Sequence, residues 1–62
     1  MKRGDLVRYK DFPENGHGIV IQVDTDMLFL YWFSGVEAIY DDYVWEYTDQ
    51  LETLTTQPKE QQ

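Results

Sequence analysis

The feature that most constrains this chain is an unbroken apolar and aromatic run over residues 27–33, with the sequence MLFLYWF. Polar residues precede it and a Ser-Gly turn follows it. The run is too short for a buried helix, which needs about 10 residues or more, so it is predicted to be a strand. Side chains alternate along a strand, and the two predicted faces are Leu28, Leu30 and Trp32 on one side and Phe29, Tyr31 and Phe33 on the other. Both faces are apolar, whereas a half-exposed antiparallel strand has one polar face. We therefore expect the second face to be covered within the domain or by a partner.

Four further segments are predicted to be short strands: residues 6–10, 19–23, 36–40 and 50–55. In the segment 19–23, we expect Ile19, Ile21 and Val23 to point inward. The Asn15-Gly16 pair before it indicates a tight turn, because both residues tolerate positive φ. In the last segment, Leu51 is expected to close the core. Residues 56–62 hold little that can be buried, so we predict one domain over residues 1–55 and a disordered polar tail over residues 56–62.

The segment 41–48 has two interpretations. Acidic residues at its start suit a helix N-terminus, whereas three aromatic residues at alternate positions suit an extended strand. We expect one short helical turn near residues 41–48, inside an otherwise extended segment.

Five short strands joined by tight turns, without a long helix, predict a small all-β barrel. The segments GDLVRY at residues 4–9 and GIVIQV at residues 18–23, with a strand that reaches Trp32 just before a glycine turn, resemble the small SH3-like barrel superfamily. The pattern is similar to its KOW and Tudor branches and to short SH3-like proteins of tailed phages. The resemblance covers residues 4–40 and, more loosely, 50–55, and the segment 41–48 departs from it. It implies a five-stranded SH3-like barrel and a phage-encoded protein of the host cytoplasm, but no particular function, since such barrels carry many unrelated binding roles.

The sequence offers no set of residues with a recognisable catalytic chemistry. There is no cysteine, and His17 is the only histidine. The acidic pairs at residues 24 and 26 and at 41 and 42 lack the longer ladder of oxygen ligands found in calcium loops. No catalytic triad, phosphate loop or nucleotide fingerprint is present. We therefore predict a protein that is not an enzyme and has no cofactor or metal site. The longest apolar run is too short to span a bilayer and no signal peptide is visible, so we expect a cytoplasmic protein without membrane contact.

The charge is distributed unevenly along the chain. Residues 1–10 carry four basic residues and one acidic residue, whereas residues 11–62 carry one basic and eleven acidic residues, which gives the net charge of −7. A chain this acidic is repelled by a polyphosphate at long range, which disfavours binding to nucleic acid.

If the chain nevertheless binds nucleic acid, the basic start would contact phosphates and an aromatic ring would stack on a base. The residues of this alternative are Lys2, Arg3, Arg8 and Lys10 for phosphates, and Tyr9 or Phe12 for stacking. A third alternative is an acidic mimic of nucleic acid that blocks a basic host protein.

The aromatic content gives the leading functional hypothesis. Ten of the 62 residues are Phe, Tyr or Trp, and a core of this size cannot bury them all. Aromatic residues are enriched where proteins contact proteins. We predict a non-catalytic interaction module that binds a protein partner, or a second copy of itself, through an exposed aromatic surface. Its residues are Phe29, Tyr31, Phe33, Tyr43, Trp45 and Tyr47. The surrounding acids favour a basic partner. The competing interpretation is that these rings cover the barrel together with the helical turn.

Overall fold

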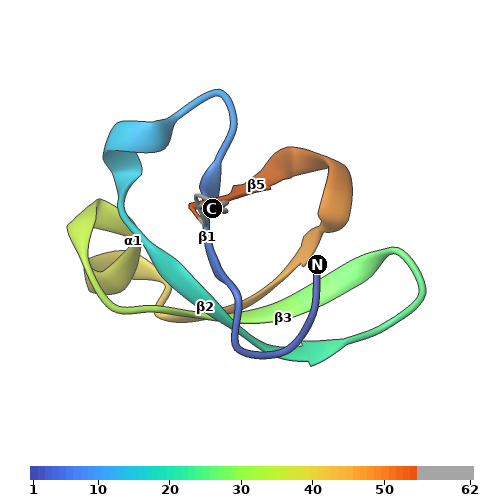
Figure 1. The fold of residues 1–62 in the computed structure, drawn as a ribbon. Helices are drawn as coiled ribbons and strands as arrows, with labels where there is room; N and C mark the ends of the chain where they lie inside the picture. Colours follow the sequence, from blue (N-terminus) through green and yellow to red (C-terminus); the bar gives the residue numbers. More distant parts are fainter. Residues whose placement is uncertain (55–62) are drawn as a thin grey trace, which may run out of the picture.

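The computed structural model describes residues 1–54, which form an antiparallel sheet of five strands with one short α-helix (Figure 1). The strands are β1 (Leu6–Tyr9), β2 (Gly18–Val23), β3 (Met27–Trp32), β4 (Tyr43–Tyr47) and β5 (Leu51–Thr53). The helix α1 (Gly35–Tyr40) joins β3 to β4, and the 3-10 turns η1 (Pro13–Asn15) and η2 (Thr48–Gln50) precede β2 and β5. The order in the sheet is β4-β3-β2-β1-β5, and no pairing joins β4 to β5 within the described residues.

The sheet is curled, and its concave side holds the hydrophobic core. Figure 1 shows β2 and β3 along the bottom, with β1 and β5 above them. Six side chains of this core are almost completely buried: Val7, Val20, Leu28, Leu30, Trp32 and Leu51. The Tyr9 ring stacks on Trp32, with 4.9 Å between ring centroids. Its hydroxyl donates a hydrogen bond of 2.8 Å to Oε2 of Glu46 on β4. This bond links β1 to β4 across the concave side, although β2 and β3 separate them in the sheet.

The alternation predicted for the central strand is confirmed. Leu28, Leu30 and Trp32 are buried, whereas Phe29 and Tyr31 lie on the convex side and are only half-buried. Leu51 also lies in the core, as expected from the sequence. The predicted tail over residues 56–62, and Thr55 at the end of the predicted last strand, lie outside the described residues.

The predicted inward face of the second strand is wrong. Val20 is buried, Ile19 and Ile21 are half-buried, and Val23 is 48% exposed. The pairing with β3 explains this result, because Val20 lies opposite the buried Leu30 and Ile19 lies opposite Tyr31. A register shift between Val20 and Gln22 then interrupts the simple alternation. The convex side of β2 therefore carries Ile19, which was expected in the core.

The strand predicted over residues 36–40 is wrong, and so is the position of the helical turn near residues 41–48, whereas the extended conformation expected for the rest of that segment is confirmed. Residues 36–40 belong to α1, and the segment 41–48 contains β4 with no helical turn before Thr48. The helix is short and closes with a hydrogen bond from the Asp41 N–H to the Glu37 carbonyl. It is held to η1 by the Asn15 side-chain amide, which donates to Oε2 of Glu37 at 3.2 Å. Because six residues make a marginal helix in isolation, such tertiary contacts decide the conformation.

Two glycines allow the loop before β2 to cross the turn after β3 at close range. Gly16 and Gly35 both have positive φ, at 132° and 79°. A Cβ atom on Gly16 would overlap the Ser34 carbonyl, and one on Gly35 would overlap the Asn15 carbonyl. The backbone N–H of His17 donates to the Ser34 hydroxyl at 3.0 Å, which fixes the crossing. The Asn-Gly turn predicted from the sequence thus serves as a contact between two distant segments.

Within residues 1–54, α1 is far too short to cross a bilayer, and no other helix there is long and apolar enough to do so.

Candidate partner-binding face

Five aromatic side chains lie together on the convex side of β3 and β4. This surface, called the aromatic face below, consists of Phe29, Tyr31, Tyr43, Trp45 and Tyr47. The strand register places Phe29 opposite Trp45 and Tyr31 opposite Tyr43. The structure therefore brings together five of the six residues predicted for partner binding.

The backbone pairing explains why these rings contact one another. The Trp32 N–H donates to the Asp42 carbonyl at 2.7 Å, and the Thr48 N–H donates to the Asp26 carbonyl at 3.0 Å. These two bonds fix which positions of β3 and β4 exchange hydrogen bonds, and the aromatic pairs occupy the alternate, non-hydrogen-bonded positions. Side chains approach most closely at such positions. The ring centroids are 5.1 Å apart for Phe29 and Trp45 and 5.0 Å apart for Tyr31 and Tyr43.

A third contact connects the two pairs into a continuous cluster. The rings of Phe29 and Tyr43 stack diagonally, with 5.9 Å between centroids. Cross-strand aromatic pairs of this kind contribute roughly 0.2–1 kcal/mol each to the stability of a sheet. The contacts hold the rings in fixed positions but leave much of their surface in water.

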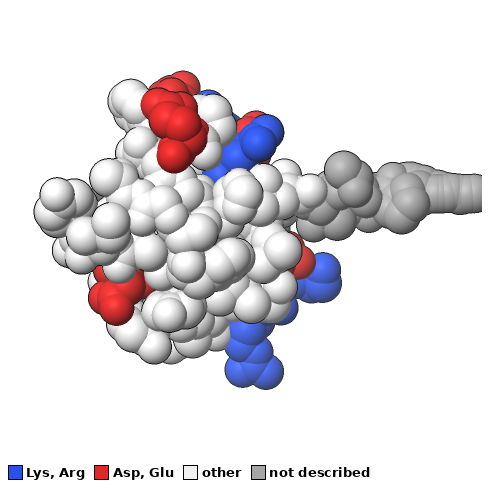
Figure 2. Space-filling model, turned by 90° about the vertical axis from the view of Figure 1, so that its left-hand side faces the viewer, with Lys and Arg blue, Asp and Glu red and all other residues white. Residues whose placement is uncertain are grey.

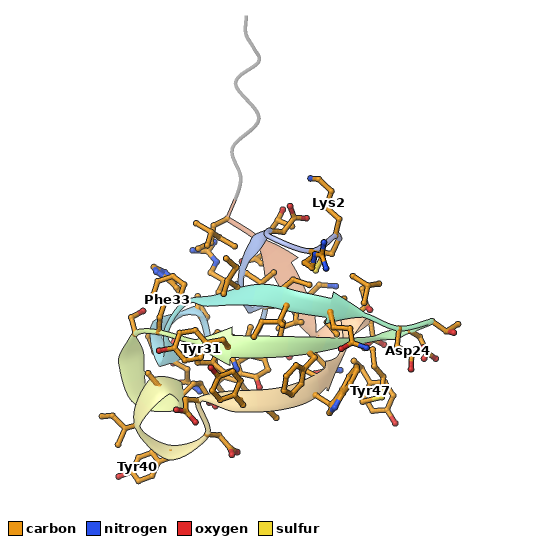
Figure 3. All side chains as sticks on the ribbon, turned by 90° about the horizontal axis from the view of Figure 1, so that it is seen from below. Lys2, Asp24, Tyr31, Phe33, Tyr40 and Tyr47 are labelled. Atoms are coloured by element: carbon orange, nitrogen blue, oxygen red, sulfur yellow. The ribbon has the colours of Figure 1, made fainter. Side chains whose placement is uncertain are left out.

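The rings on β4 are the most exposed part of this cluster. Tyr43, Trp45 and Tyr47 are 57%, 43% and 55% exposed. Figure 3 looks onto this side of the sheet: Tyr31 lies towards the end near α1, and Tyr47 lies towards the opposite end, near Asp24. Because these rings remain exposed, the competing interpretation that a helical turn covers them does not fit the structure.

The apolar surface continues from the aromatic face across β2 to β1. Tyr31 lies opposite Ile19, and Ile19 lies opposite Leu6, which is 41% exposed. On β1, an ion pair between Arg8 and Glu52, with 2.6 Å between Nε and Oε2, follows on the same side of the strand as Leu6. Ile19 and Leu6 were not predicted to lie on this surface, because Ile19 was expected in the core and Leu6 was given no role. The apolar character of both faces of the central strand was the signal that could have found them.

The sixth predicted residue, Phe33, lies beyond the end of β3 and is 47% exposed. Figure 3 shows it at the same end of the sheet as Tyr31. The neighbouring helix adds exposed apolar side chains, with Ile39 and Tyr40 the most exposed at 76% and 80%. Seen from the side of α1, the surface is almost free of charged atoms, which appear only along its rim (Figure 2).

Three residues of the nucleic-acid alternative already have partners within the protein. The Tyr9 ring is packed on Trp32, and burial, together with the hydrogen bond to Glu46, raises the pKa of its hydroxyl. One face of the Tyr9 ring is therefore occupied by Trp32.

Two of the basic residues form ion pairs. Arg8 is paired with Glu52, and the ammonium of Lys2 lies 3.1 Å from Asp5. The backbone N–H and ammonium of Lys2 lower the pKa of the Asp5 carboxyl. The side chains of Arg3, Lys10 and Phe12 are exposed.

The part of the chain that the structure describes contains neither a pocket nor a group of three potential metal ligands. His17 is exposed and lies on the loop before β2. One buried polar atom, Nε1 of Trp32, has no hydrogen-bond partner there. The candidate site is therefore an open surface and not a cavity.

Comparison with protein-family models, with curated proteins and with solved structures found no match to this chain.

Proposed function

We propose that this chain is a non-catalytic interaction module that binds a protein partner through the aromatic face. The observation that supports this most directly is the exposure of Tyr43, Trp45 and Tyr47 side by side on one strand. Tyr and Trp contribute most at protein interfaces, because they bury a large area with few rotatable bonds. Stacking within the aromatic face already restricts several rings, which lowers the entropy lost on binding.

We also infer that the curled sheet belongs to the SH3-like barrel class. Support comes from the five antiparallel strands, from the position of β1 between β2 and β5, and from the bond between Tyr9 and Glu46 across the concave side. The resemblance of the sequence to short SH3-like proteins of tailed phages supports a phage origin and a partner in the host cytoplasm. The positions of Tyr9 and Arg8 give no support to binding of nucleic acid, and the acidic mimic stays a prediction from the net charge.

The proposal predicts that binding depends on a ring of the aromatic face and not on exposed aromatic residues in general. Trp45→Ser removes the central ring of β4, and Tyr40→Ser removes a more exposed ring on α1 as a matched control. Truncation of an interface hot spot costs about 2 kcal/mol or more, which is roughly a 30-fold loss of affinity. We expect this loss for Trp45→Ser and an unchanged affinity for Tyr40→Ser.

The measurement is capture of partners from native cell extract on the immobilised full-length chain, followed by mass spectrometry and by titration of the purified partner. Circular dichroism confirms that each variant is folded. A folded Trp45→Ser variant that binds the partner as tightly as the unmodified chain would contradict the proposal.

A further inference from the structure

β4 forms one edge of the sheet, and most of its outward backbone groups are open. Hydrogen-bonded positions alternate along an antiparallel pair. Since Asp42 and Thr48 bond to β3, so do Val44 and Glu46, and the N–H and C=O groups of the three residues between them point away from β3. Of these three, the Tyr47 N–H donates to Oε1 of its neighbour Glu46 at 3.2 Å. The N–H groups of the other two, Tyr43 and Trp45, have no backbone or side-chain acceptor within residues 1–54, because β4 pairs with β3 alone.

This edge lacks the usual protection against pairing with another chain. Proteins protect edge strands with lysine, proline, bulges or a very short length. β4 has five residues with the sequence YVWEY, and its register with β3 shows no bulge. Its one charged residue, Glu46, is already engaged with Tyr9 and Tyr47. By contrast, the opposite edge strand, β5, has three residues. The free edge of β4 is thus a template for an added strand.

We propose that the partner binds by strand addition: an extended, basic segment of a protein pairs with the free edge of β4. This inference rests on the proposed function and specifies the kind of partner. Tyr43 and Trp45, whose N–H and C=O groups point to the free edge, also place their rings on the aromatic face. An added strand would therefore place alternate side chains directly beside these rings, and the sheet and its apolar surface would both be extended.

The charges around the edge identify the occupant. Asp41 and Asp42 immediately precede β4, and Asp49 follows it in η2; all three are exposed. Asp26 is exposed and adjoins the same end, through the hydrogen bond from Thr48. Residues 11–54 contain no lysine or arginine that could neutralise these acids. The nearest basic residue in the sequence, Lys10, forms its backbone hydrogen bond with Gln50, which lies beyond the end of β4. Both ends of the edge are therefore acidic and favour lysine or arginine on the incoming segment.

A second copy of this chain fits the edge poorly. An antiparallel pair of β4 strands would bring Asp41 and Asp42 of one copy towards Asp49 of the other. Each copy also carries a net charge of −7. Repulsion between like charges at such an interface opposes the wrong partner.

The test uses a synthetic extended peptide and the full-length chain. The peptide has alternating valine and threonine, is long enough to pair with β4, and has a pair of lysines at each end; it carries a fluorescent label for polarisation measurements. Two further versions carry methyl groups on alternate backbone nitrogens, one version for each edge of the peptide. We expect the parent peptide and one methylated version to bind equally, and the other methylated version to bind at least 10-fold more weakly.

Two measurements on the protein locate the contact. Hydrogen exchange of the Trp45 amide should slow at least 10-fold when the parent peptide is added, whereas that of the Val44 amide, already bonded to β3, should not change. Tyr43→Pro removes an outward N–H at an edge position where proline is tolerated, and should weaken binding at least 10-fold. Tyr43→Val also removes the ring but keeps the N–H, so Tyr43→Pro should bind at least 10-fold more weakly than Tyr43→Val.

Several outcomes would overturn strand addition. Equal binding of both methylated peptides would mean contact through side chains and charge alone, and would leave the proposed function standing. Absence of binding at low salt, or equal binding when glutamate replaces lysine, would exclude a basic segment as the occupant. A dimer in light scattering with the Trp45 amide already protected would identify a second copy instead. The proposed function itself fails only in the separate capture experiment, if a folded Trp45→Ser variant retains the partner.

Discussion

At the scale of single residues, Tyr9 connects the core to the edge of the sheet. Its ring stacks on Trp32, and its hydroxyl donates to Glu46 on β4. The same carboxylate accepts the Tyr47 N–H through its other oxygen. One tyrosine hydroxyl therefore helps to hold the strand that carries most of the aromatic face.

Tyr9→Phe should remove this bond and destabilise the fold by about 1 kcal/mol at neutral pH, the usual net value of one hydrogen bond. Burial first, and then the bond to Glu46, raise the pKa of the Tyr9 hydroxyl in the folded state above its unfolded value of about 10. Above that pH the unfolded state releases the proton while the folded state keeps it, so the stability that this group provides is lost as the pH rises. The advantage of the unmodified chain over Tyr9→Phe should therefore be constant below about pH 9 and should shrink above pH 10. Urea unfolding of both proteins, followed by circular dichroism from pH 8 to pH 11, measures the difference in their free energies of unfolding. A difference that stays constant up to pH 11 would contradict the pKa shift.

At the scale of elements, the helix found over residues 35–40, where a strand was predicted over residues 36–40, leads to a test of its own. As a strand, residues 36–40 would place Ala38 and Tyr40 on the same face. In α1, Ala38 packs against the core and Tyr40 is 80% exposed. Tyr40→Lys should change the free energy of unfolding by less than about 0.5 kcal/mol, as is usual for exposed sites. Ala38→Lys should cost about 2 kcal/mol or more, because it places an unpaired charge against the core. Equal losses in thermal or urea unfolding would argue for the strand.

The elements that could be predicted from sequence are those whose pattern is fixed locally. The run over residues 27–33 gave both faces of β3 correctly, since its length and alternation leave no other conformation. Residues 36–40 mix strand-forming side chains with Ala38, and their helix depends on Asn15, far away in the sequence. The inward residue of β2 depends on its register against Leu30. Five rings of the candidate site were predicted to share a surface, whereas Leu6 and Ile19 join it only through pairing between strands.

At the scale of the whole molecule, the net charge of −7 on 62 residues opposes compaction. Only two ion pairs are present within residues 1–54, and both lie at the surface, between Lys2 and Asp5 and between Arg8 and Glu52. Surface pairs contribute about 0–1 kcal/mol each, so self-repulsion should dominate. Raising the ionic strength from about 0.01 to 0.15 M shortens the Debye length from about 30 to 8 Å, and should raise the Tm. Thermal unfolding in sodium chloride checks this, and a Tm that falls would mean that the ion pairs outweigh the repulsion.

The crossing of Gly16 and Gly35 also limits how the length of this chain can vary among natural or engineered versions. Exposed loop tips usually accept inserted residues, but the two loops that meet here are interlocked, so that an insertion in one would displace the other. The hairpin tip at Asp24–Asp26 is exposed and takes no part in this crossing. An inserted tag or epitope should therefore be tolerated better at that tip. An insertion in the loop that contains Gly16 would need a compensating change in the loop that contains Gly35, and the reverse also holds.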